Sequence, residues 1–242
     1  RYEQLPGKPD VIGTLPDDVP SIELARLADL SREPLLIPVG VREDTLQPAC
    51  LELYEGEHLL IAGPARSGKS TLLMAIVQVL RSIDGADRPA VWGICDRRSP
   101  LGGAGLDRCA GSPDEIPALL AALRLESGPV FLLIDDAERV DDSDQSITSL
   151  LNAGIPGLCV IAAGRAADLR ALYNHWTKIV RKSRCGVLLQ PDIDYDGDLL
   201  GVTIPRRAPV AMTQGRGYAC VSGAIALIQS ISPSAGEGAT GW

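Results

Sequence analysis

The chain carries Gly63-Pro64-Ala65-Arg66-Ser67-Gly68-Lys69-Ser70, followed by Thr71, and this stretch decides the fold. It matches the phosphate-binding pattern G-x-x-x-x-G-K-[ST] at every fixed position. An apolar run at 58–62 precedes it, and a helix-like run at 71–80 follows it. Because strand, loop and helix in this order are the setting in which the pattern binds phosphate, we predict that residues 63–71 form a phosphate cradle.

Each fixed position of this loop has a physical reason. Gly63 and Gly68 let the backbone curl so that successive N–H groups point at one anion. The helix that follows adds its positive N-terminal end. Lys69 supplies a mobile charge for the outer phosphates, and the Ser70 hydroxyl is a ligand for Mg²⁺. We therefore predict ATP and Mg²⁺ as ligands, against the alternative of a glycine-rich turn that binds nothing.

The composition is that of an ordinary globular α/β protein of 242 residues, with 45% hydrophobic and 4% aromatic residues. The formal charge of −8 argues against a surface devoted to nucleic acid. No stretch is long and apolar enough to cross a bilayer, and no signal peptide is visible. Because the sequence starts at Arg1 rather than Met, we expect an excised piece of a longer chain, in which a membrane anchor could lie elsewhere.

The cysteines are expected to be small core residues rather than metal ligands. None of the 6 forms a C-x-x-C pair, and only 2 histidines are present to assist them. A zinc site is therefore not expected, and the predicted use of nucleotide favours a reducing compartment. The six are Cys50, Cys95, Cys109, Cys159, Cys185 and Cys220.

Strand-like and helix-like segments alternate along the chain. Apolar runs at 130–136 and 158–164 are typical of parallel strands buried on both faces. We expect further strands at 35–40, 49–53, 90–96, 186–190, 217–221 and 224–229, and helices at 21–27, 113–125 and 143–152, with Ser21 and Ser112 as caps. This order predicts an α/β fold with a mostly parallel central sheet flanked by helices and a small β-rich terminal part. Residues 1–20, rich in Pro, Gly and Asp, are predicted to be a linker, and residues 21–242 a single domain.

Two carboxylates, Asp135 and Asp136, end the apolar run at 130–136. The carboxyl ends of parallel strands face the ligand crevice, where hydrolysis needs a metal-ordering acid and a group that orients water. We predict that Asp135 supports the metal together with Ser70, and that Asp136 faces the attacking water. Asp136 stands where many such enzymes have the longer glutamate, so we expect weak or conditional hydrolysis. The alternative for both is a solvated acidic turn, shared with Glu138, Asp141, Asp142 and Asp144.

Several basic residues are candidates for phosphate contacts. The strand at 158–164 lacks the usual Asn, Gln or Thr at its end, which leaves Arg165 as the polar candidate or as a solvated helix start. A basic cluster near 178–184 could supply an arginine finger to a neighbouring subunit, although a solvated face is the simpler interpretation. The cluster is Lys178, Arg181, Lys182 and Arg184, and the same two interpretations apply to Arg206 and Arg207.

Segments spread along nearly the whole chain carry a family resemblance. They are Leu15-Pro16, 37–40, the loop at 58–71, the paired aspartates at 132–136, and the closing segments 186–190, 196–201 and Gly215-Arg216-Gly217-Tyr218. Together they resemble the FtsK/SpoIIIE ring ATPases and, more narrowly, the tandem ATPase modules of the type VII secretion motor, the EccC/EssC family. The phosphate loop is shared by many families, so the Gly-Arg-Gly ending is the discriminating part.

This resemblance implies a P-loop NTPase of the RecA/ASCE type with ATP and Mg²⁺ bound through Lys69, Ser70 and Asp135. It implies that the chain is the C-terminal one of several tandem ATPase modules. A separate N-terminal region would hold the full-length protein at the cytoplasmic face of the bacterial membrane. The partners of the module would be neighbouring modules of the same chain and ring, a hexamer in the full-length protein. Small helical-hairpin substrates would dock through C-terminal tails, at a surface that no motif marks. Slow ATP turnover is a further implication.

Two other functions remain open at this level. A DNA-translocating ATPase of the same superfamily would show salt-dependent DNA binding, which the acidic balance disfavours. A non-hydrolysing adaptor for substrate tails would use ATP only as a stabilising ligand.

Overall fold

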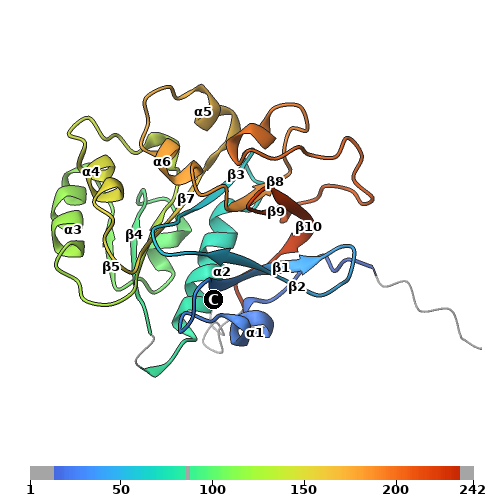
Figure 1. Cartoon of the computed structure of the whole chain (residues 1–242), viewed down its shortest axis with the longest axis horizontal. Helices are drawn as coiled ribbons and strands as arrows, with labels where there is room; N and C mark the ends of the chain where they lie inside the picture. Colours follow the sequence, from blue (N-terminus) through green and yellow to red (C-terminus); the bar gives the residue numbers. More distant parts are fainter. Residues whose placement is uncertain (1–13, 86–87, 235–242) are drawn as a thin grey trace, which may run out of the picture.

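The computed structural model describes residues 14–85 and 88–234, which form one ten-stranded sheet with helices on both faces (Figure 1). The strand order is β2-β1-β10-β9-β8-β3-β7-β6-β4-β5. The strands are β1 (Leu35–Arg42), β2 (Pro48–Leu53), β3 (Leu59–Gly63), β4 (Ala90–Ile94), β5 (Arg108–Ala110), β6 (Val130–Ile134), β7 (Leu158–Arg165), β8 (Gly186–Leu189), β9 (Arg216–Val221) and β10 (Ala224–Ser230). The α-helices are α1 (Ser21–Leu24), α2 (Lys69–Arg81), α3 (Ile116–Leu123), α4 (Ser146–Asn152), α5 (Ala166–Ala171) and α6 (Thr177–Arg181).

The sheet has a parallel part and an antiparallel part. Strands β8, β3, β7, β6, β4 and β5 run parallel to one another. Strands β2, β1, β10, β9 and β8 pair antiparallel, and most of them lie to the right of the parallel strands in Figure 1. The predicted mostly parallel sheet with a β-rich terminal part is confirmed.

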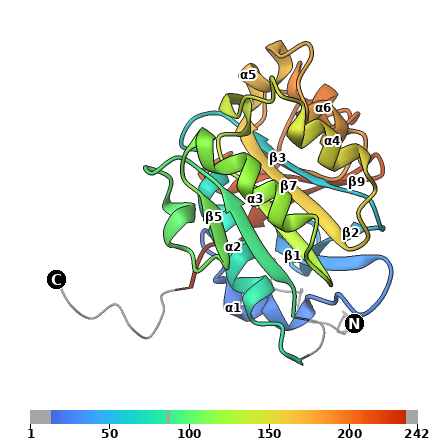
Figure 2. The ribbon, with the colours of Figure 1, turned by 90° about the vertical axis from the view of Figure 1, so that its left-hand side faces the viewer.

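Alternating side chains of the strands build two cores, one on each face of the sheet. On β3, Leu59 and Ile61 join the core under α1 and α2, whereas Leu60 and Ala62 join the core under α3, α4, α5 and α6. All of β3 is buried, as expected for a strand covered on both faces. Figure 2 shows α3 and α4 near the viewer, α5 and α6 above, and α1 below. None of the helices within 14–85 and 88–234 is long and apolar enough to cross a membrane.

The predicted helix at 21–27 is shorter than expected, and its predicted cap is wrong. The α-helix ends at Leu24 and continues as a 3₁₀ turn, Ala25–Leu27. Pro20 occupies the cap position, while the Ser21 hydroxyl donates to Gln78 Oε1 on α2 at 2.6 Å. The Ser21 hydroxyl therefore bonds to α2 and does not form the predicted cap of its own helix.

The helices predicted at 113–125 and 143–152 begin later than expected. Residues 113–115 form a 3₁₀ turn before α3, and Ser112 precedes that turn without a capping hydrogen bond from its side chain. Before α4 the Asp142 carboxylate accepts from the amides of Ile147 and Thr148 at 2.7 and 2.9 Å. Strand β5 was not predicted, whereas α5 was considered only as a helix start at Arg165 and α6 only as a helical stretch near the basic cluster at 178–184, because each is too short to show a period.

The part of the predicted linker that the structure describes, residues 14–20, packs on the domain. Leu15 and Val19 are buried. The Ser232 amide donates to Val19 O at 2.8 Å, and Pro20 forms a parallel bridge with Ser232 beyond β10. Residues 1–13 of the predicted linker lie outside the described residues.

Most of the cysteines are core residues, as predicted. Burial raises the pKa of Cys220 to about 12 and also raises the pKa of Cys159 and Cys185, so these thiols stay uncharged at neutral pH. Cys109 is exposed. Buried positions are Cys95, Cys159, Cys185 and Cys220.

His58, just before β3, makes stability depend on pH. Its Nδ1 accepts from the Val160 amide at 3.3 Å, and burial lowers its pKa from 6.5 to about 4. The unfolded chain therefore binds this proton at a higher pH than the folded one, so stability falls as pH drops from about 6.5 towards about 4. We expect a loss of roughly 3 kcal/mol from this group across that window, read from urea unfolding at several pH values.

His58→Asn keeps an acceptor near the Val160 amide and cannot titrate. In this variant the free energy of unfolding should fall less between about pH 6.5 and about pH 4. His175→Asn, at a half-buried site, should change this dependence on pH less. If the free energy of unfolding of the His58→Asn variant changes with pH as much as that of the original chain, this assignment is wrong.

Candidate functional site

The phosphate loop connects the end of β3 at Gly63 to the start of α2 at Lys69. Gly68 has φ +106°, a left-handed conformation that favours glycine. A Cβ on Gly63 would lie 2.4 Å from Leu189 O and 2.7 Å from Ser67 Oγ, so this position also needs glycine. The predicted order of strand, loop and helix is thus present, with both glycines where the backbone requires them.

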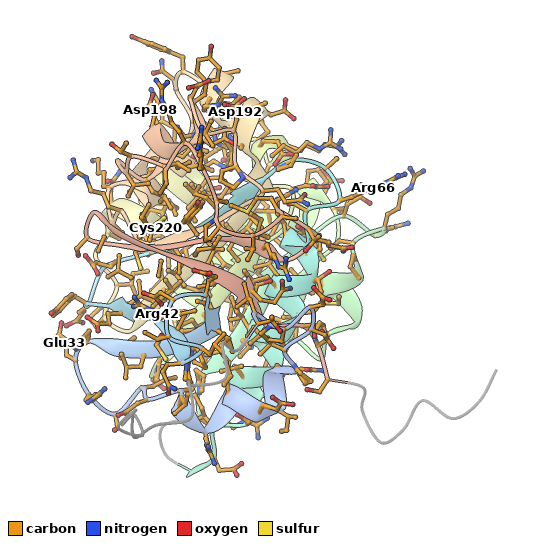
Figure 3. All side chains as sticks on the ribbon, turned by 90° about the vertical axis from the view of Figure 1, so that its right-hand side faces the viewer. Glu33, Arg42, Arg66, Asp192, Asp198 and Cys220 are labelled. Atoms are coloured by element: carbon orange, nitrogen blue, oxygen red, sulfur yellow. The ribbon has the colours of Figure 1, made fainter. Side chains whose placement is uncertain are left out.

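The tip of the loop faces solvent and its base is buried. Pro64, Ala65 and Arg66 are exposed, and Figure 3 shows the Arg66 side chain reaching away from the body of the protein. Ser67 is fully buried, and its hydroxyl has no hydrogen-bond partner within the described residues. A polar atom of this kind at the base of the loop fits a cradle that binds a polar ligand.

Lys69 lies within the loop itself. Its Nζ donates to Pro64 O at 2.7 Å and to Gly63 O at 3.2 Å. Burial lowers the pKa of this ammonium, while the nearby carboxylates, Glu138 first among them, act in the opposite direction. Both acceptors are loop carbonyls, so the ammonium lies where an anion in the cradle would meet it.

Ser70 and Asp135 are brought together from α2 and from the end of β6. The Ser70 hydroxyl donates to Asp135 Oδ1 at 3.2 Å, and the Ser99 hydroxyl donates to Oδ2 at 2.5 Å. The Asp135 side chain is buried. Magnesium takes few protein oxygens beside waters and phosphates, so a hydroxyl and a carboxylate in contact fit it. Bound there, the cation would neutralise charge on phosphate oxygens.

Ser99 is a site residue that the sequence analysis missed. It lies after β4, whose carboxyl end adjoins that of β6 in the sheet. Its hydroxyl fixes the second oxygen of Asp135 and so orients the first towards Ser70. The available signal was its place after a predicted strand, since strand ends converge at one edge of a parallel sheet.

Asp136 forms no hydrogen bond or ion pair with residues 63–71 within the described residues, although its charge acts on Lys69. Its φ is +47°, its side chain is 39% exposed, and its carboxylate lies 3.9 Å from Arg139. It lines a cavity of about 560 Å³ beside β4, α3 and α4, together with Asp141 and Asp144. Residues 63–71 do not line that cavity. The predicted catalytic role of Asp136 stays a prediction, and its geometry favours the alternative of an acidic turn.

Glu138 reaches the end of β7 instead. Its carboxylate, on a side chain only 4% exposed, accepts from the Arg165 amide at 3.1 Å through Oε2. Arg165 pairs with Gly63 across β7 and β3, so this carboxylate is bonded to the strand neighbour of the first residue of the phosphate loop. The Arg165 guanidinium is 44% exposed, with Nε 3.9 Å from Glu138 Oε1. The sequence analysis had placed Glu138 only in a solvated turn.

The closing segment packs directly on the phosphate loop. The Gly215 amide donates to Ser67 O at 2.9 Å, and the Ser230 amide donates to Gly215 O at 2.8 Å. A Cβ at Gly68 would lie 3.4 Å from the Gly215 amide nitrogen. The Gly-Arg-Gly turn therefore supports the loop from the antiparallel side of the sheet, a contact between distant segments that the sequence did not reveal.

The basic cluster near 178–184 lies on and after α6. The Arg181 guanidinium donates to Leu169 O within its own domain, and burial lowers its pKa. Lys178 Nζ lies 4.6 Å from the centre of the Tyr173 ring. Arg206 and Arg207 are exposed. An arginine finger among these residues stays a prediction, and Arg181 is the one already held by an internal partner.

The amino-acid sequence is similar to that of ESX secretion system proteins. No family model matches the chain. The ESX-3 secretion system protein EccC3 of Mycobacterium tuberculosis is 31% identical over 177 residues, 58% of this chain and 13% of the relative. The ESX secretion system protein EccC of Thermomonospora curvata is 27% identical over 234 residues, 84% of this chain and 17% of the relative. The chain thus spans less than a fifth of the length of these relatives.

Solved structures of the same group share the fold. The cytoplasmic domain of the Thermomonospora curvata type VII secretion ATPase EccC matches with a TM-score of 0.67 and 25% identity, over 91% of this chain and 28% of that one. ATPases 2 and 3 of that EccC, in complex with a signal sequence peptide, match with a TM-score of 0.67 and 24% identity, over 91% of this chain and 44% of that one. With its phosphate loop and paired Ser70 and Asp135, the chain is similar over most of its length to one ATPase module of the EccC/EssC type VII secretion ATPases.

Proposed function

We propose that this module binds ATP with Mg²⁺ and hydrolyses it slowly, as part of a type VII secretion motor. The observation that carries the proposal is the hydrogen bond between Ser70 Oγ and Asp135 Oδ1, at the mouth of an intact phosphate loop. The hydroxyl and the carboxylate are the two protein ligands that a nucleotide-bound magnesium needs. Lys69, turned into the loop, supplies the ammonium for the outer phosphates.

Slow turnover is proposed because the polar groups around the γ-phosphate are few. Strand β7 ends at Gly164 and Arg165, without the Asn, Gln or Thr that would contact phosphate there. Two carboxylates, Asp136 and Glu138, follow Asp135 and are the candidates to face the attacking water. Transition-state charge would then be stabilised mainly by the loop amides, Lys69 and the cation.

We also propose that the module acts together with others of its kind. The relatives are several times longer than this chain, and one solved neighbour is described as ATPases 2 and 3 in complex with a signal sequence peptide. By analogy, substrate tails of small helical-hairpin proteins would dock on a module of this type. Ring assembly would be a property of the longer chain, so we expect the piece alone to run as a monomer in gel filtration.

Nucleotide released from the denatured purified protein tests the function directly. Bound ATP would support tight binding with slow turnover, and bound ADP would support hydrolysis. Phosphate release with added ATP and Mg²⁺ then gives the rate. A protein that holds no nucleotide and binds no added ATP would overturn the proposal.

The same assay separates the two remaining alternatives. Turnover that rises on addition of duplex DNA would favour a DNA translocase, which the charge of −8 disfavours. Bound ATP that raises the unfolding temperature without any phosphate release would favour a stabilised adaptor.

A further inference from the structure

The two carboxylates after Asp135 diverge from the end of β6. In the sheet, β6 lies between β7 and β4, and β7 lies between β6 and β3. Glu138 turns towards β7, the neighbour of β3, whose end begins the phosphate loop, and Asp136 lines a cavity on the β4 side. The left-handed conformation of Asp136 turns the chain between them. Of these two carboxylates, Glu138 is the one directed to the β3 side of β6, and its charge acts more strongly on Lys69.

The Glu138 carboxylate is buried and only half satisfied. Oε2 accepts from the Arg165 amide at 3.1 Å, whereas Oε1 has no hydrogen-bond partner within the described residues. Buried polar atoms are nearly always paired, and exceptions call for an explanation such as a catalytic role or a bound water. A water bound at Oε1 would satisfy this atom.

Gly164 makes room for this carboxylate. A Cβ at Gly164 would lie 2.7 Å from Glu138 Oε2, closer than real Cβ contacts. The absence of a side chain at Gly164 thus leaves the space that the Glu138 side chain occupies at the end of β7.

The charges around Glu138 suit a base. Burial raises its pKa, and Lys69 is close enough to lower it in part. A carboxylate whose pKa is moved towards neutrality accepts a proton more readily than a solvated one. The Asp136 side chain is 39% exposed, against 4% for Glu138.

We propose that Glu138, rather than Asp136, is the catalytic residue that holds and deprotonates the attacking water. This rests on the proposed ATPase function. The water oxygen forms a bond to the γ-phosphorus, and the bond from that phosphorus to the β–γ bridging oxygen breaks. ADP leaves with that electron pair, and the water proton passes to the Glu138 carboxylate and then to solvent. The Arg165 amide keeps the carboxylate in place throughout.

Three variants of the whole chain test the assignment, each replacing a carboxylate by its amide. They are Glu138→Gln, Asp136→Asn and Glu126→Gln, the last at an exposed position beyond α3. ATP affinity is measured by titration calorimetry and turnover by phosphate release. We expect Glu138→Gln to lose on the order of 100-fold in turnover with affinity kept, because a positioned base contributes at least that much. Asp136→Asn should lose far less, and Glu126→Gln nothing.

The outcomes separate this assignment from the function on which it rests. If the original chain hydrolyses ATP and Asp136→Asn loses as much as Glu138→Gln or more, the assignment is wrong and the ATPase function stands. If the original chain binds ATP and never releases phosphate, both are wrong.

A second variant, Gly164→Ala, keeps the test valid should Glu138→Gln fold poorly. Its Cβ would push Glu138 Oε2 aside, so turnover should fall while ATP affinity is kept. Unchanged turnover in a folded Gly164→Ala protein would contradict the assignment.

Discussion

Lys69→Ala is expected to weaken ATP binding by about 100-fold or more, because hydrogen bonds to charged groups contribute roughly 1.5–3 kcal/mol each and Lys69 would make more than one. The ammonium lies in the loop, with Gly63 O and Pro64 O as its partners. Alanine leaves the backbone of the cradle unchanged but removes the only side-chain cation that the described residues place inside it. Titration calorimetry with ATP and Mg²⁺ measures the loss.

The control for this variant is Lys178→Ala, which removes an exposed ammonium that lies over Tyr173. It should bind ATP as the original chain does. The unfolding temperature of Lys69→Ala without nucleotide should stay close to that of the original chain, because a buried ammonium is costly to desolvate and its removal relieves that cost. Unchanged ATP affinity in Lys69→Ala would remove Lys69 from the proposed site.

Arg216→Ala is expected to reduce the free energy of unfolding by about 3 kcal/mol, in the range found when one partner of a buried polar network is removed. The guanidinium is 8% exposed and holds four segments together. It donates to Gln229 Oε1 at 3.2 Å, Ala211 O at 3.0 Å, Leu15 O at 3.5 Å and Asp17 Oδ1 at 2.7 Å. Its loss leaves Gln229 Oε1 and Leu15 O, the two acceptors in buried contacts, without this donor and leaves a cavity between β9, β10 and the chain near Leu15.

Urea unfolding measures this effect, and for a domain of this size the transition temperature should fall by roughly 10 °C. Arg216→Lys should recover only part of the loss, since an ammonium cannot reproduce the planar fork that spans these acceptors. Arg206→Ala removes an exposed guanidinium and should stay within about 0.5 kcal/mol of the original chain. If the urea midpoints of Arg216→Ala and Arg206→Ala are equal, the hydrogen bonds of the Arg216 guanidinium add nothing to stability.

The parallel part of the fold followed from sequence because its signals are local. A continuous apolar run such as 130–134 can only be a strand or helix buried on both sides, and its length favours a strand. The loop at 63–68 needs glycine at two defined positions, and those glycines are readable without any knowledge of the sheet. The short elements β5, α5 and α6 carry no such signal, because three to six residues do not display a period.

The site could be predicted only in part. Lys69 and Ser70 are fixed by the loop, and Asp135 by its place at the end of an apolar strand, so all three were named from sequence. Ser99 and Glu138 were not, because their distance from the loop along the chain says nothing of which strand end they reach. Their positions depend on β4 and β7 lying on either side of β6.

What the sequence indicated by itself is the candidate anion cradle and the acid proposed to face it, since backbone curvature and strand burial are set by neighbouring residues. What only the tertiary structure decided is which second carboxylate approaches the cradle and what supports the loop from behind. Asp136 and Glu138 are two residues apart, yet a left-handed turn and the order of the strands send them to opposite sides of β6. The contact of Gly215 with Ser67 likewise joins residues that only the folded sheet brings together.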